Sequence, residues 1–122
     1  MHVIDLFTIV QDMAREFLGG FELLVLLALV KLGDDAYGVT VAQEIEASSG
    51  RTVAVGSLYL TLKRLEQKKL ISSRRGEPTA ERGGRAKTHF SVTGKGVRAA
   101  AHAQRTLTTL WSGVPRLQGE GA

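Results

Sequence analysis

The sequence contains no cysteine among its 122 residues. Disulfide bonds and thiolate metal sites are therefore excluded, and the composition suits a reducing compartment. The longest apolar run, Leu23 to Val30, is far below the roughly 18 to 20 residues that span a bilayer. The N-terminus has no cationic segment ahead of an apolar one, so we expect no signal peptide. We expect a chain without a membrane span that works in the cytoplasm.

Residue groups that carry catalysis or bind cofactors are equally scarce. His2, His89 and His102 are scattered, and no two of them have the i and i+4 spacing of a metal-binding helix. Gly94 and Gly96 precede a helical segment but lack the rest of a dinucleotide-binding pattern. We therefore expect no enzyme activity, no catalytic residues, no metal site and no cofactor.

The residues that are present are those of one globular domain with an uneven distribution of charge. Apolar residues make up 43% of the chain and charged residues 23%, and the formal net charge is +4. Between Lys63 and Lys87 lie nine bases and three acids, a net charge of +6, whereas the rest of the chain, with seven bases and nine acids, carries −2. A basic segment on a neutral-to-acidic scaffold is typical of proteins that bind the phosphates of nucleic acids.

The basic segment begins with a predicted amphipathic helix at residues 56–69. Leu58, Leu62 and Leu65 follow at steps of four and three and form an apolar stripe. A separate polar stripe is formed by Ser57, Thr61, Arg64 and Lys68. Such a helix can bury one side and offer the other to a DNA groove.

The remaining patterns predict a mainly α-helical chain with one β-hairpin. Further helices are expected at residues 3–17, 21–31, 36–49 and 93–111, and strands at 70–75 and 86–92 flank a polar loop. This order indicates a winged helix-turn-helix with additional terminal helices. We divide the chain into an N-terminal dimerisation helix, a DNA-binding domain, a C-terminal dimerisation helix and a disordered tail, at residues 1–20, 21–92, 93–112 and 113–122.

Five motifs, in this order and spacing, resemble the PadR family of bacterial transcriptional regulators. They are Leu23 to Leu32 followed by Gly33, then Tyr37-Gly38, then Leu58-Tyr59-x-x-Leu62-x-Arg64-Leu65-Glu66 ending in Leu70-Ile71, then Gly83-Gly84-Arg85, and Thr93-x-x-Gly96. The resemblance covers residues 23–99. It implies a homodimeric winged-helix repressor of the short branch, in which the terminal helices dimerise. Departures include Ala54-Val55, where a side-chain cap is usual, and Leu60, where proline is frequent.

The resemblance and the charge pattern together define the residues expected to contact DNA. They are Tyr37, Gly38, Ser57, Tyr59, Leu60, Thr61, Lys63, Arg64, Lys68, Arg82, Arg85 and Lys87. Structural alternatives stay open for several of them. Arg64 could pair with an acid on a neighbouring helix, Leu60 could be core, Tyr59 could be purely structural, and Gly38 could only permit close helix packing.

The terminal helices supply the expected dimer interface. Their apolar stripes contain Leu6, Val10, Met13, Leu107 and Trp111. Trp111 is the only tryptophan, and it could either stack on a flat or cationic effector or simply fill the interface. The expected partners are therefore a second copy of the chain, double-stranded DNA with an inverted repeat, and a small-molecule effector. The alternative function is a winged helix that docks an acidic protein through its basic wing.

Overall fold

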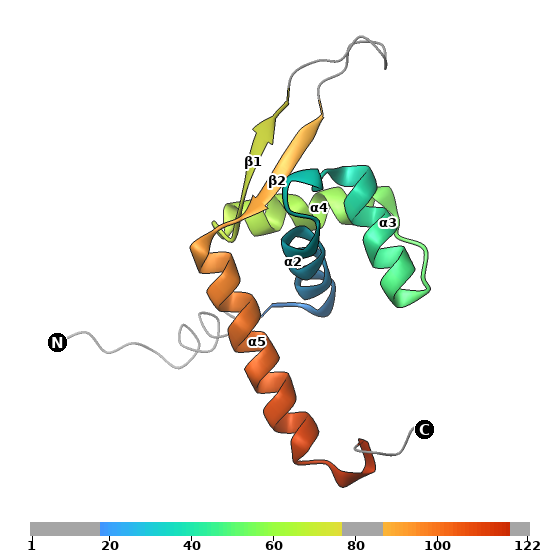
Figure 1. The fold of residues 1–122 in the computed structure, drawn as a ribbon, viewed down its shortest axis with the longest axis vertical. Coiled ribbons are helices and arrows are strands. Elements are labelled where there is room, and N and C mark those ends of the chain that lie inside the picture. Colours follow the sequence, from blue (N-terminus) through green and yellow to red (C-terminus); the bar gives the residue numbers. More distant parts are fainter. Residues whose placement is uncertain (1–17, 77–86, 118–122) are drawn as a thin grey trace, which may run out of the picture.

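The computed structural model describes residues 18–76 and 87–117. Figure 1 shows helix α2 at the centre, α3 and α4 around it, the hairpin on one side, and α5 extending away from the other elements. The elements are α2 (Gly20–Leu32), a 3-10 turn (Gly33–Asp35), α3 (Gly38–Ser49), α4 (Val55–Gln67), β1 (Ile71–Arg75), β2 (Thr88–Val92), α5 (Gly94–Ser112) and a short 3-10 helix (Pro115–Leu117). The winged helix-turn-helix fold expected from the sequence is confirmed.

Three sets of expectations lie outside the described residues. They are the N-terminal helix with Leu6, Val10 and Met13, the loop with Arg82 and Arg85, and the final residues 118–122. The expected tail at 113–122 is wrong in part, because Pro115–Leu117 form a short helix. Among the residues that the structure describes, no helix is both long enough and apolar enough to cross a bilayer.

Helix α2 contributes to the hydrophobic core, but with one face only. Its buried side chains pack against the apolar stripe of α4, the inner face of α3 and the base of the hairpin. The buried residues are Val25, Leu26, Ala28, Leu29, Ala36, Val41, Ile45, Leu58, Leu62, Leu65, Leu70, Ile71 and Phe90. Leu24, Leu27 and Val30 on the other face of α2 are about half exposed. A helix with apolar residues on all sides is usually buried on all sides, but α2 is buried on one side only.

The hairpin is fixed to the start of α3 by backbone contacts. β1 and β2 are antiparallel, in a register that runs from Ile71 opposite Val92 to Arg75 opposite Thr88. The N–H of Phe90 donates to the carbonyl of Ala36 at 2.9 Å, and its ring is buried. The wing is therefore held against the helices at its base.

Helix α5 starts as its sequence predicts. Thr93 is the N-cap, and its Oγ1 accepts a hydrogen bond from the N–H of Gly96 at 3.1 Å. The same hydroxyl donates to the carbonyl of Lys69 at 2.8 Å. The cap thus joins the first turn of α5 to the end of α4.

Candidate nucleic-acid interface

Helix α4 presents one buried face and one open ridge. The buried face contains Leu58, Leu62 and Leu65, together with Thr61, which is only 6% exposed. The prediction that Thr61 lies on an exposed polar stripe is therefore wrong. It falls between Leu58 and Leu65 on the helix surface, and its methyl group suits a position facing the core.

The opposite side of α4 is an unbroken exposed row, which we call the outer ridge. It contains Gly56, Leu60, Lys63 and Gln67, at positions i, i+4, i+7 and i+11. Leu60 is 50% exposed, which rules out the alternative that it is a core residue. Gly56 and Gln67 were not expected as site residues, although the spacing of the row could have identified them.

One flank of the outer ridge meets the start of α3. Tyr59 is half exposed, and its hydroxyl lies directly over Gly38. A Cβ at Gly38 would overlap this hydroxyl and lie 2.9 Å from Cζ of the ring. Gly38 therefore permits close approach of the two helices, as its structural alternative proposed, and Tyr59 fixes the position of α3 beside the ridge.

The wing is held on the same flank through Tyr37, the residue before α3. The ring of Tyr37 packs edge-on against His89, with 5.7 Å between ring centroids, and the two residues form an isolated β-bridge. Nζ of Lys87 lies 4.2 Å from the centroid of the Tyr37 ring. Thr40 Oγ1 accepts a hydrogen bond from the backbone N–H of Tyr37 at 3.0 Å. Tyr37 thus links the wing to the helix pair.

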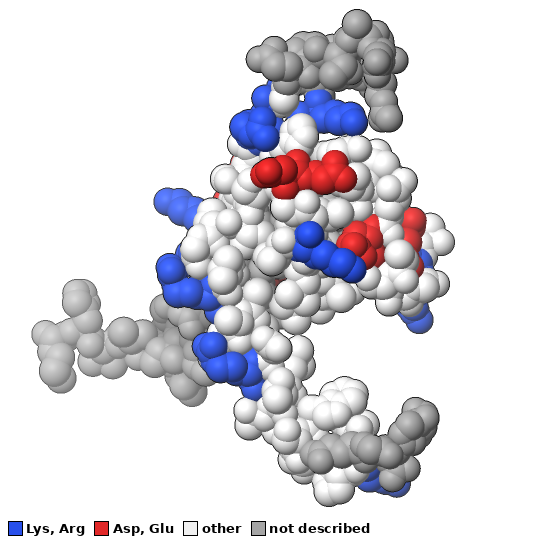
Figure 2. Space-filling view, in the orientation of Figure 1, with Lys and Arg blue, Asp and Glu red and all other residues white. Residues whose placement is uncertain are grey.

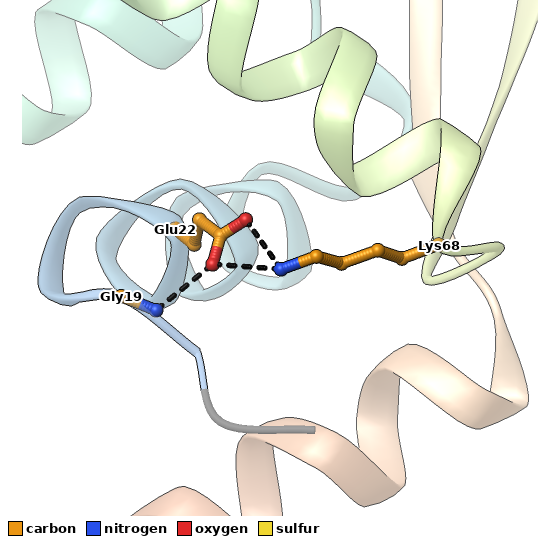
Figure 3. Close-up of polar contacts among 3 residues, drawn as sticks. All are labelled: Gly19, Glu22 and Lys68. Carbon is orange, nitrogen blue, oxygen red and sulfur yellow. Dashed lines mark hydrogen bonds and ion pairs between the residues drawn. The ribbon is translucent and has the colours of Figure 1, made fainter. Parts of the chain in front are cut away.

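The other flank of α4 faces α2. Nζ of Lys68 contacts the Glu22 carboxylate at 2.8 and 3.1 Å, and the N–H of Gly19 donates to the same group at 2.8 Å (Figure 3). Ser57 borders a cavity of about 480 Å³ beside Phe21 and Leu24. The expected stripe of DNA contacts on this flank is therefore not supported for Lys68, whose ammonium is held by an acid on α2.

The environment of Glu22 favours its ionised form. Burial of the carboxylate opposes ionisation, but the hydrogen bonds from Lys68 and Gly19 and the charges of Lys68 and Arg64 outweigh it. Together they hold the pKa of Glu22 below its ordinary value. Arg64 thus acts on an acid of a neighbouring helix through its charge, and no direct ion pair between the two is observed among the described residues.

Replacing Glu22 with Gln is expected to lower the free energy of unfolding at neutral pH by about 1 kcal/mol. Because the folded-state pKa of Glu22 is lowered, its contribution is present above the unfolded-state pKa of about 4.3 and is lost as pH falls through the folded-state value. Urea unfolding between neutral and acid pH should therefore show a shallower acid loss in the variant. Glu44→Gln is the control, since Lys31 opposite it is 68% exposed. Equal pH profiles for wild type and Glu22→Gln would contradict this assignment.

Charge is separated across the surface. Figure 2 shows Lys and Arg side chains at the end of the described hairpin and also along α5, and Asp and Glu side chains near the start of α3 and over α3 itself. The basic segment seen in the sequence thus remains a local basic surface after folding. Within residues 18–76 and 87–117, no group of three His, Asp or Glu side chains could hold a metal ion.

Helix α5 carries an exposed apolar stripe beyond the winged helix. Leu107, Leu110 and Trp111 are each more than half exposed. Beside the stripe, α2 and α5 enclose a cavity of about 240 Å³ lined by residues such as Leu18, Leu23 and Leu107. The structure therefore presents a long apolar surface on the helix expected to dimerise.

Comparisons with known proteins agree with this geometry. Residues 26–102 match the family described as the transcriptional regulator PadR-like family. A PadR-like transcription factor from Bacteroides fragilis is 25% identical, with a TM-score of 0.68 over 88% of this chain and 97% of its own. A PadR family regulator from Eggerthella lenta is 25% identical, with a TM-score of 0.62 over 93% of this chain and 95% of its own.

A PadR family regulator from Clostridium difficile, 23% identical, shares the fold with a TM-score of 0.67 over 83% of this chain and 100% of its own. A search among curated proteins gave no match. The family match covers more than half of the chain, and its members regulate transcription by binding DNA and are not enzymes. The chain therefore belongs to the PadR-like family of transcriptional regulators.

Proposed function

We propose that the protein is a homodimeric repressor that binds an inverted-repeat operator with α4 in the major groove and the wing along the backbone. The observation that carries this proposal is the outer ridge of α4, which is exposed along its whole length beside a basic hairpin. An α-helix fits the major groove, and basic residues at its side can neutralise phosphates. Such a protein works where the DNA is, so we assign it to the cytoplasm.

The contacts that we propose differ by region. Leu60, Lys63 and Gln67 of the outer ridge face the bases, since they point away from the core. Phosphate contacts are assigned to Tyr37, Ser57, Tyr59, Arg64, Arg82, Arg85 and Lys87. Three residues expected to contact DNA are left out. Gly38 and Thr61 are buried, and Lys68 is paired with Glu22.

Dimerisation would set the operator geometry. Two α4 helices related by a two-fold axis reach successive major grooves about 34 Å apart, so the half-sites should lie about 10 base pairs centre to centre. We propose that the stripe on α5 forms the interface together with residues 3–17 of the partner. The exposed apolar area on α5 supports this interface, because a large apolar patch on the surface of a protein usually marks a site where a partner binds.

Electrophoretic mobility shifts on the DNA just upstream of the gene test the proposal. Changing Arg82 and Arg85 together to Ala should weaken binding to all sequences, and the slope of log K against log salt should fall by about 0.9 for each phosphate that is no longer neutralised. Lys63→Ala should cost about 1–3 kcal/mol, mainly on the specific fragment. Equal losses on specific and random DNA for both variants would show that α4 does not read sequence. Failure to bind any DNA, with capture by an acidic protein, would favour the interaction-module alternative.

Release by an effector is the last part of the proposal. Trp111 is 56% exposed on α5, and one indole from each chain near the two-fold axis could stack on a planar cation. A ligand lowers operator affinity only by its differential affinity for the two dimer shapes. Quenching of the single tryptophan by planar dyes, with loss of the operator complex, is the measurement. Dyes that bind a Trp111→Ala variant equally well would leave Trp111 as interface packing.

A further inference from the structure

We propose that this regulator recognises its half-site through a thymine methyl group contacted by Leu60, and that Gly56 lets α4 approach the bases closely enough for that contact. The proposal rests on the DNA-binding function given above. It adds the chemical group that Leu60 contacts and the role of Gly56 in permitting that contact.

Leu60 is not required by the packing of the chain. The apolar face of α4 is complete without it, because Leu58, Leu62 and Leu65 are buried on the opposite side. Half of the Leu60 side chain is exposed at the middle of the outer ridge. In the major groove the base edges present hydrogen-bond donors and acceptors and one apolar group, the C5-methyl of thymine. An exposed leucine that faces this groove is therefore complementary to thymine.

Gly56 supplies a second and independent observation. It lies in the first turn of α4, one turn before Leu60 on the outer ridge, and a glycine there disfavours the helix relative to alanine. Its φ is not positive, and apart from its chain neighbours and the backbone of its own helix no atom lies within 4 Å of the place where a Cβ would stand. The packing and the backbone of the chain therefore do not require glycine at this position. A missing side chain at the leading end of the ridge allows the helix to lie deeper in the groove.

The charges around the ridge identify nucleic acid as its occupant. Lys63 follows Leu60 on the outer ridge, and Arg74 and Arg75 lie exposed on β1. Glu66, the acid nearest the ridge on α4, accepts a hydrogen bond from Ser73 at 2.6 Å and is held toward the hairpin. An exposed apolar residue on a ridge that also carries a lysine suits a polyanion that carries methyl groups.

The experiment uses synthetic DNA and the full chain. Duplexes with a randomised centre are selected for binding, and each thymine of an enriched sequence is then replaced by deoxyuridine, which lacks only the C5-methyl. At one or two thymines per half-site we expect wild-type affinity to fall about fourfold per methyl group, the equivalent of one buried methylene. Leu60→Ala should bind the thymine and deoxyuridine duplexes equally. Val30→Ala, which shortens a similarly exposed aliphatic side chain on α2, should keep the wild-type difference.

A Gly56→Ala variant tests the role of Gly56, because its thermal stability and its DNA affinity should change in opposite directions. The thermal midpoint should rise, since alanine favours the helix and meets no atom of the chain, while affinity for the selected duplex should fall more than tenfold. Unchanged affinity would refute the role of Gly56.

The outcomes separate this inference from the function on which it rests. Selection of a defined sequence whose deoxyuridine forms all bind like thymine would refute methyl readout and leave the DNA-binding function standing. The same conclusion follows if Leu60→Ala keeps the full difference. If no sequence is enriched at all, the proposed sequence-specific function fails, and this inference fails with it.

Discussion

Replacing both Leu107 and Leu110 with Glu is expected to yield a monomer whose operator affinity is lower by on the order of a thousandfold. Both leucines are more than half exposed in the single chain and lie on the stripe that contains Trp111. If a partner covers this stripe, each glutamate would have to bury an unpaired charge, which is strongly unfavourable. A monomer engages one half-site only, so the contribution of the second recognition helix disappears.

Light scattering over micromolar concentrations measures the mass, and mobility shifts measure the affinity. Thr108→Glu/Thr109→Glu is the matched control, because it adds the same two charges to the same turn at exposed polar positions. It should remain dimeric and bind the operator. A wild-type mass of one chain at all concentrations would refute the dimer, and a dimeric Leu107→Glu/Leu110→Glu variant would place the interface elsewhere.

Replacing Gly96 with Ala is expected to lower the free energy of unfolding by about 1–3 kcal/mol, or more if α5 cannot shift. The carbonyl of Leu70, which accepts the N–H of Thr93 at 3.0 Å, stands directly against Gly96. A Cβ would overlap this carbonyl oxygen and lie 2.6 Å from Cγ1 of Val92. Because a backbone carbonyl in a hydrogen bond cannot move aside as a side chain can, α5 itself must be displaced from the hairpin.

Thermal unfolding at matched protein concentration measures the destabilisation, with about 3–6 °C expected per kcal/mol for a chain of this length. Gly94→Ala is the control two residues earlier. The nearest atom to its Cβ would be the end of the Arg98 side chain at 3.4 Å, which can move. Gly94→Ala should therefore be neutral or slightly stabilising. Equal melting temperatures for the two variants would show that Gly96 does not determine how α5 docks.

Much of the fold follows from local patterns in the sequence. The leucines of α4 are assigned correctly to the core, because a 3.6-residue period places Leu58, Leu62 and Leu65 on one side of a helix whatever lies opposite. Thr93 is assigned correctly as a cap, since its hydroxyl acts on a backbone N–H three residues away. The basic segment predicted from the sequence places Lys and Arg side chains at the end of the described hairpin (Figure 2).

The direction in which each polar residue of α4 points was decided by tertiary structure. Periodicity places Thr61 and Lys68 on one stripe. How much of α4 is buried depends, however, on how α2 and the hairpin pack against it, and the buried face includes Thr61. Lys68 is drawn to Glu22, which is 46 residues away in the chain. Such a partner cannot be identified from spacing alone.

The sequence by itself thus determined the winged-helix order, the apolar faces, the cap of α5 and the concentration of positive charge, because these depend on neighbours within a few residues. Only the tertiary structure decided that Gly38 accommodates Tyr59, that Tyr37 connects the wing to α3, and that the open ridge of α4 runs from Gly56 to Gln67. These features depend on contacts between segments far apart in the chain, which form only when the buried faces of the helices pack together.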